Sequence, residues 1–167
     1  RNTSRWSDRH RMDLFEYNRN AWNLQSLEGC RWSTPYPDEV IERAKGGDWS
    51  VLLTPNRAVP RDWFPAYPDL GGLRILALAS GGGQQVPVFA AAGAEVTSFD
   101  GSDVQLEKDE ETCARHGLRI NAIQGDMADL SGLAPGSFDL IFNPVSNVFA
   151  ASLEPIWCEC HRVLKPG

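Results

Sequence analysis

Hydrophobic and polar residues follow two different patterns along the chain, and the change falls near residue 70. Beyond it, short apolar runs alternate with longer stretches of helical spacing. The runs predict strands at 73–79, 95–99, 119–124 and 138–142, and the stretches predict helices at 85–92, 102–116 and 152–163. Strands that alternate with helices through short connections predict βαβ units and a doubly wound, mostly parallel sheet.

Two of the predicted helices carry further detail. Ser102 and Gln105 fit a capping box at the start of helix 102–116, and Gly117 suits its end. Its acidic run 107–111 is expected to be a solvated face. The helix at 152–163 is expected to pack on the core through an apolar stripe made of Leu153, Ile156, Trp157, Cys160, Val163 and Leu164.

Residues 1–70 lack this alternation of strand-like and helix-like patterns, and they contain five of the six tryptophans. Helices are expected at 12–27 and within 34–49, where Pro37 suits a first turn and Gly46 a C-terminal cap. The segment 53–72 has too many prolines for a central strand or a long helix. We therefore expect a helical, Trp- and Pro-rich N-terminal extension over 1–70, followed by a ligand-binding α/β unit over 71–167.

Composition narrows the function classes. The 167 residues are 42% hydrophobic and carry a formal net charge of −6. This charge gives no electrostatic footprint for nucleic acid, and the basic cluster at 1–11 is interrupted by acids, so we expect no nucleic-acid partner. The four cysteines show no zinc spacing, which predicts reduced thiols in a cytoplasmic protein without a metal site. No apolar run is long enough to span a membrane, and the oligomeric state stays open.

The turn after the first predicted strand carries the candidate chemistry. Gly81, Gly82 and Gly83 follow an apolar run, and Asp100 ends the next strand 19 residues after Gly81. Glycines let a ligand approach the backbone, and an acid about 20 residues later can accept both hydroxyls of a ribose. A dinucleotide fingerprint would need a glycine where Val86 stands, and a P-loop would need a lysine in the turn.

Later motifs extend this pattern. "QGDM" (124–127) closes the third strand, "GSFDLIFNPVSNVF" (136–149) covers the fourth strand and its loop, and "HRVLKPG" (161–167) ends the next helix. From about residue 71 to 167, this succession resembles the class I S-adenosylmethionine-dependent methyltransferases. The resemblance implies a Rossmann-like fold, here truncated after the fourth strand and its helix, and S-adenosylmethionine as the cofactor.

The resemblance also implies site residues. The backbone of Ser80 to Gly83 would lie against the methionine moiety, Asp100 would hold the ribose, and Asp126 would accept from the adenine amino group. The implied cofactor site contains Ser80, Gly81, Gly82, Gly83, Asp100, Gly101, Ser102, Gln105, Gly125, Asp126, Met127, Asn143 and Pro144. The family's first motif commonly has an acid in the strand and a glycine at the start of the turn, where this chain has Ala77 and Ala79.

The acceptor is expected to be a small molecule, and no catalytic residue is identified. Tyr17, Trp22 and Asn23 of the first helix, together with Ser146, are the candidates for substrate binding. The aromatic residues of the extension could dock its helices onto the sheet, or the extension could form a lid over the cofactor. Two other functions stay open: an NAD-type oxidoreductase domain, and a non-catalytic nucleotide-sensing or interaction domain on a methyltransferase scaffold.

Overall fold

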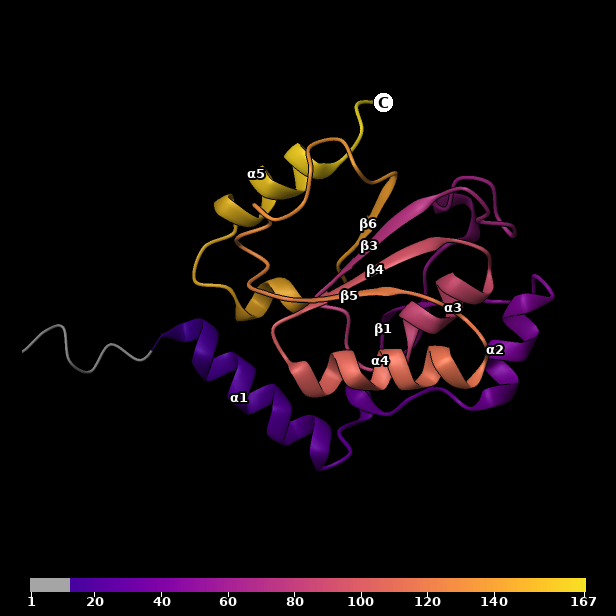
Figure 1. Cartoon of the computed structure of the whole chain (residues 1–167), viewed down its shortest axis with the longest axis horizontal. Helices are drawn as coiled ribbons and strands as arrows, with labels where there is room; N and C mark the ends of the chain where they lie inside the picture. The colour runs from indigo at the N-terminus through magenta and orange to yellow at the C-terminus, as the bar shows by residue number, and fades with distance from the viewer. Residues whose placement is uncertain (1–12) are drawn as a thin grey trace, which may run out of the picture.

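A computed structural model describes residues 13–167 and contains a four-stranded parallel sheet (Figure 1). The strands are β3 (Arg74–Leu78), β4 (Glu95–Asp100), β5 (Asn121–Gln124) and β6 (Leu140–Phe142). Their order across the sheet is β5-β4-β3-β6, so the chain moves outward from β3 in one direction and then returns to its other side. This reversal confirms the predicted doubly wound, Rossmann-like fold and places a switch point between β3 and β6.

Helices cover both faces of the sheet. α3 (Gln85–Ala91) and α4 (Asp103–Arg115) pack on one face, and α5 (Glu154–Val163) packs on the other. Side chains of β3 alternate between these layers: Ile75 and Ala77 join the core with α3, whereas Leu76 and Leu78 join the core with α5. Because both faces are covered, β3 is apolar throughout its buried length.

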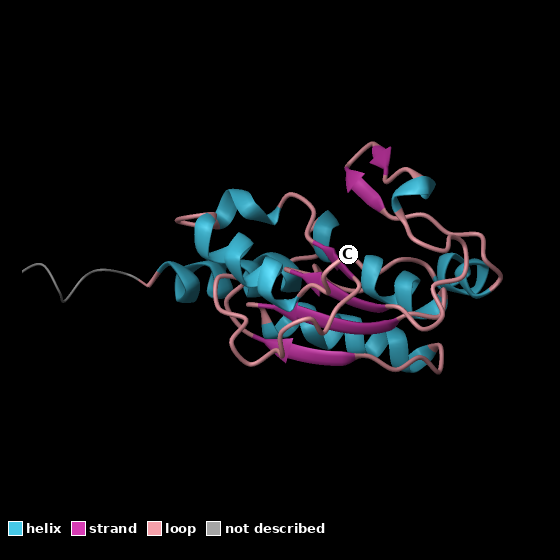
Figure 2. Ribbon diagram, turned by 90° about the horizontal axis from the view of Figure 1, so that it is seen from above, coloured by secondary structure: helices cyan, strands magenta, loops and turns pink. Residues whose placement is uncertain are grey.

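The N-terminal region consists of short elements. α1 (Leu14–Leu27) begins with Asp13, whose carboxylate caps the backbone N–H of Phe15, and α2 (Asp38–Lys45) follows Pro37. The proline-rich segment contains a two-stranded antiparallel sheet, β1 (Leu52–Thr54) and β2 (Arg57–Ala58), which stands apart from the main sheet (Figure 2). The 3₁₀ turns η1 (Arg31–Ser33) and η2 (Arg61–Trp63) flank these elements, and η3 (Ser146–Phe149) follows β6.

Two sequence expectations about helix faces are wrong. Trp157 is 62% exposed, because Ile156, Cys160 and Val163 form the stripe of α5 that faces the core and Trp157 lies about 100° away from it. Leu153, another residue of the expected stripe, precedes the first turn of α5 and is 43% exposed. The acidic run at 107–111 is not uniformly solvated either, because Asp109 is fully buried. The basic cluster at 1–11 lies outside the described residues. Within residues 13–167, no helix is long and apolar enough to cross a membrane.

Candidate functional site

A cavity of about 460 Å³ opens at the carboxyl ends of β3, β4 and β5. This is the edge where parallel α/β sheets bind ligands, and the volume suits a drug-sized molecule. The sheet side of its lining consists of polar groups and bare backbone, from Ala79, Gly81, Asp100, Gly101, Ser102, Gln105, Gly125 and Asp126. The opposite side is largely apolar, with Asp13, Asn18 and Arg19 at α1 as its polar members, and its apolar residues are Leu14, Phe15, Trp22, Trp32, Leu52, Leu53, Val145 and Phe149.

Asp100 lies at the tip of β4, between the glycine turn and the start of α4. Its Oδ2 accepts from the backbone N–H of Gly81 (3.3 Å) and its Oδ1 from that of Ser102 (2.8 Å). Burial raises the pKa of Asp100 to about 6, although these backbone hydrogen bonds lower it in part. Each carboxylate oxygen keeps a further lone pair, so Asp100 can still accept two hydroxyls of a ligand.

The end of β5 supplies the second acid of the cavity. Oδ1 of Asp126 accepts from the backbone N–H of Ala128 (2.9 Å), which holds the side chain in a turn. The residue before it must be small, because a Cβ on Gly125 would lie 2.4 Å from the ring of Phe99. Gly125 therefore lets the aromatic ring of β4 pack against the strand end that presents Asp126.

The three glycines of the turn have different surroundings. Gly81 lines the cavity, whereas Gly82 and Gly83 are buried beneath it with Ser80. Gly83 has a φ of +72°, and a Cβ there would meet Pro35 at 2.7 Å and Thr112 at 2.9 Å. The missing side chain therefore makes room for Pro35 and Thr112 at Gly83, and at Gly81 for the carbonyl of Trp32, which a Cβ would approach to 3.2 Å.

The segment after α1 is fastened to this turn. The backbone N–H of Tyr36 donates to the carbonyl of Gly83 (2.9 Å), and the side chain of Gln84 donates to the carbonyls of Arg31 and Thr34 (2.7 and 2.9 Å). Lys108 of α4 adds bonds to two further carbonyls of the N-terminal region. Part of the N-terminal extension is thus one wall of the site.

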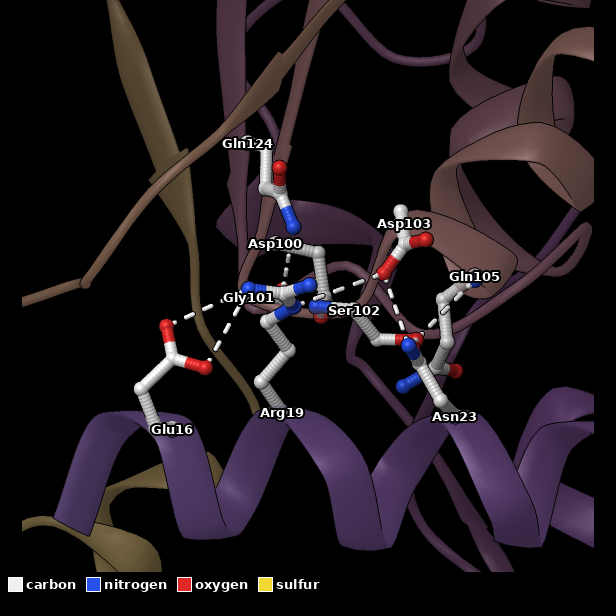
Figure 3. Close-up of polar contacts among 9 residues, drawn as sticks. All are labelled: Glu16, Arg19, Asn23, Asp100, Gly101, Ser102, Asp103, Gln105 and Gln124. Atoms are coloured by element: carbon white, nitrogen blue, oxygen red, sulfur yellow. Dashed lines mark hydrogen bonds and ion pairs between the residues drawn. The ribbon is translucent and has the colours of Figure 1, made fainter. Parts of the chain in front are cut away.

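α1 reaches the same site through its polar face. Figure 3 shows Glu16, Arg19 and Asn23 pointing from α1 toward residues 100–105. Asn23 accepts from the hydroxyl of Ser102 (2.6 Å) and donates to the carboxylate of Asp103 (2.7 Å), whose pKa is lowered chiefly by this hydrogen bond. Asn23 therefore links α1 to the first turn of α4 and does not line the cavity.

The loop after β6 forms the remaining wall. Asn143 bonds with the side chains of Ser146 and Asn147, which fixes the start of η3. The ring of Trp22 meets the ring of Phe149 edge-on, with centroids 5.3 Å apart. This contact closes the cavity between α1 and η3.

The structure brings most of the sequence-predicted residues to one place. Those lining the cavity are Gly81, Asp100, Gly101, Ser102, Gln105, Gly125, Asp126, Met127, Pro144, Trp22 and Ser146. Those outside the lining are Ser80, Gly82, Gly83, Asn143, Asn23 and Tyr17. Tyr17 is 54% exposed and faces solvent for most of its surface.

Sequence reasoning missed Asp109, which lies behind the glycine turn. Its Oδ1 accepts from the backbone N–H of Gly83 (2.6 Å), and its Oδ2 accepts from the hydroxyls of Ser80 (2.9 Å) and Ser98 (2.7 Å). A signal existed in the sequence: Asp109 is three residues after Leu106 and four before Cys113, which places it on the apolar stripe of α4.

Comparisons with known proteins agree with this geometry. The Methyltransferase domain family matches residues 76–167, more than half of the chain. The chain belongs to this methyltransferase family. It is 47% identical over 152 residues to the uncharacterized methyltransferase YbaJ of Bacillus subtilis, covering 91% of this chain and 58% of YbaJ. It is also 30% identical over 161 residues to the sterol 24-C-methyltransferase ERG6B of Gibberella zeae, covering 93% of this chain and 37% of that protein.

A solved structure shows the same architecture. The S-adenosylmethionine dependent methyltransferase from Mesorhizobium loti matches with a TM-score of 0.53 and 27% identity, covering 64% of this chain and 47% of that one. The chain spans about three fifths of the length of YbaJ and less than half of the other two proteins. Family membership implies S-adenosylmethionine as the methyl donor and decides against the NAD-type alternative.

The residues of this chain fit that donor. Asp100 and Asp126 are carboxylates at the ends of adjacent strands, and Gly81 exposes backbone beside them. Among residues 13–167, no cluster of histidine, cysteine and acidic side chains could hold a metal ion.

Proposed function

We propose that this chain forms the cofactor-binding part of an S-adenosylmethionine-dependent methyltransferase that acts on a small, largely apolar acceptor. The observation that carries the proposal is the row of Asp126, Asp100 and Gly81 along one cavity wall, at the ends of β5, β4 and β3. Neighbouring strands lie about 4.8 Å apart. A nucleoside laid across these ends would place its base near Asp126, its ribose near Asp100 and its methionine part near Gly81.

The donor supplies a methyl group on a positively charged sulfur, which is activated for displacement without a metal. The protein's task is then to hold the donor and acceptor in line and to keep water away. Asp100 would orient the ribose by accepting from its hydroxyls. Trp22, Phe149 and their apolar neighbours would close the opposite side of the cavity against solvent.

The apolar wall supports the choice of acceptor. Six aromatic residues line the cavity together with aliphatic residues of α1 and β1, namely Phe15, Trp22, Trp32, Tyr36, Phe99 and Phe149. Such a wall favours a hydrophobic ligand over a highly charged one. The sterol methyltransferase among the relatives has a name that points to a substrate of this kind. The residues for acceptor contact are Trp22 and Ser146, which line the cavity.

The same geometry supports a division of the chain into two parts. We assign residues 71–167 to donor binding and residues 1–70 to a lid and acceptor wall, in which α1, η1 and β1 supply most of the residues that line the cavity. A cytoplasmic location is supported by four free cysteines, and the absence of a nucleic-acid partner by the negative net charge.

Calorimetric titration tests the cofactor assignment. We expect S-adenosylmethionine and S-adenosylhomocysteine to bind at micromolar concentrations, and Asp100→Ala to weaken both by at least tenfold, because the ribose hydroxyls lose their acceptor. NADH is the matched control and should not bind. Binding of NADH alone would refute the assignment.

A second measurement separates an enzyme from a sensing domain. The full-length protein is incubated with S-adenosylmethionine carrying a labelled methyl group and with a panel of apolar acceptors, including sterols. We expect label to appear in an acceptor together with released S-adenosylhomocysteine. Tight binding without transfer to any acceptor class would favour the non-catalytic alternative.

A further inference from the structure

The turn from Ser80 to Gly83 has little intrinsic preference for one conformation. It contains three consecutive glycines, each of which has access to more backbone conformations than any other residue. The three residues before it are Ala77, Leu78 and Ala79, whose side chains cannot accept a hydrogen bond. The conformation that presents Gly81 to the cavity must therefore be imposed by groups outside the turn.

One carboxylate bonds both ends of this turn. Oδ2 of Asp109 accepts from the hydroxyl of Ser80, the first residue, and Oδ1 accepts from the backbone N–H of Gly83, the last. The distances are 2.9 Å and 2.6 Å. Because Asp109 is fully buried in a helix, its position is set by the packing of α4 and does not depend on solvent.

The same carboxylate is fixed relative to the sheet. The hydroxyl of Ser98, in the middle of β4, donates to Oδ2 of Asp109 at 2.7 Å and lies 2.9 Å from the hydroxyl of Ser80. Two residues later on that strand, Asp100 accepts from the N–H of Gly81. β4 and α4 thus hold the turn at Ser80, Gly81 and Gly83, and Gly81 is the one of these three that lines the cavity.

We infer that Asp109 is the positioning residue of the donor site: it sets the conformation of the Ser80–Gly83 turn by hydrogen bonding to both of its ends, without touching the ligand. The inference rests on the proposed function, because it concerns the part of the turn that would face the methionine end of the donor. Asp109 does not line the cavity, so its substitution changes ligand affinity only indirectly, and the two bonds to the turn are the most direct route.

Two ligands separate this role from a general contribution to folding. S-adenosylhomocysteine would reach the turn, whereas adenosine would contact only the ends of β4 and β5. In the full-length protein, we expect Asp109→Ala to raise the Kd of S-adenosylhomocysteine at least tenfold and that of adenosine less than threefold, measured by calorimetry. Equal losses for both ligands, or no loss for either, would refute the inference.

Conservative variants keep the test valid if Asp109→Ala does not fold. Asp109→Asn retains an acceptor for the N–H of Gly83 and a donor for the two hydroxyls, so it should return the Kd of S-adenosylhomocysteine to within threefold of the wild-type value. Ser98→Ala removes one bond of the network and should raise that Kd about three- to fivefold. An Asn variant that binds as weakly as Asp109→Ala, or a Ser98→Ala variant with unchanged affinity, would contradict positioning through these bonds.

The matched control is Cys113→Ala. Cys113 is buried one turn further along α4 than Asp109 and makes no hydrogen bond to the glycine turn. It should lower the Tm without changing the ratio of the two Kd values. A wild-type protein that binds neither ligand would refute the proposed function. A wild-type protein that binds both, with an Asp109→Ala variant indistinguishable from it, would refute only the inference.

Discussion

Two parts of the N-terminal region are attached to the α/β unit in different ways. The part from α2 to η2 contributes Ile41, Trp49 and Val51 to the main hydrophobic core, each 3% exposed or less. α1 instead attaches through polar contacts around Asn23 and an edge-on contact of Trp22 with Phe149. The first part is a structural component of the fold, whereas α1 has the weaker attachment expected of the lid that we propose.

The largest difference that this comparison predicts is in stability, between variants of Trp49 in the first part and of Trp22 in α1. Trp49 packs against Phe64, Tyr67 and Phe89, and its indole N–H donates to the carbonyl of Pro68 (2.7 Å). Trp49→Ala should lower the free energy of unfolding by about 3–5 kcal/mol, because it leaves a cavity and an unpaired carbonyl. Urea denaturation measures the loss, and a loss below about 1 kcal/mol would show that this part is not core.

The α/β unit to which both parts attach contains a buried titratable group, Asp109, and this predicts a pH effect. Burial raises the pKa of Asp109 to about 7, with a smaller contribution from the charge of Asp100. The folded chain therefore holds this proton at pH values where the unfolded chain has released it. The stability associated with it is present below the unfolded pKa of about 4 and is lost as the pH rises to about 7.

Asp109→Asn does not titrate at this position, so its stability relative to the wild type should increase from pH 4 to pH 7 by about 2–4 kcal/mol and then stay constant. Asp100 and Cys113, the other titratable groups coupled to Asp109, are present in both proteins. Urea denaturation of both proteins across this pH range provides the measurement. A difference that is independent of pH would show that Asp109 titrates normally.

For α1, the comparison predicts a change in affinity with little change in stability. Trp22→Ala should weaken binding of S-adenosylhomocysteine about tenfold, because the cavity opens between α1 and η3, and should lower stability by about 1 kcal/mol or less. Tyr17→Ala on the same helix is the control, since Tyr17 does not line the cavity. Calorimetry and thermal unfolding should show that Trp22→Ala mainly lowers affinity, whereas Trp49→Ala mainly lowers stability. A Trp22→Ala variant that loses stability and affinity together would make α1 part of the core.

The smallest predicted effect lies in the turn itself. Ala79 adopts a φ of +52°, which strains a residue with a Cβ by roughly 1–2 kcal/mol, whereas glycine adopts it freely. After the larger chain entropy of glycine is included, Ala79→Gly should raise stability by about 0.5 kcal/mol. The control Ala77→Gly, in the extended strand, should lower it by about 1 kcal/mol. A loss in both variants would show that Ala79 is not strained.

The strand and helix order could be predicted from the sequence because burial on a sheet and on a helix leaves different spacings of apolar residues. In the proline-rich segment, the spacing of apolar residues does not predict the strands. Its two short strands, β1 and β2, are almost entirely exposed and carry no alternating pattern, so their pairing was not predicted. Trp157 shows the opposite error. The apolar pattern predicts that it packs on the core, but it lies beside the stripe of α5 that does so and is exposed.

The sequence by itself determined the parallel sheet, the glycine turn and the acids at the ends of β4 and β5, because these features depend on residues that are close along the chain. Tertiary structure decided which atoms meet the bare backbone of "SGGG". Pro35 and Thr112 pack on Gly83, and Asp109 bonds both ends of the turn. Those partners lie 26 to 48 residues away from Gly83. Their contact depends on how α4 and the N-terminal segment pack on the sheet, which no local pattern of residues encodes.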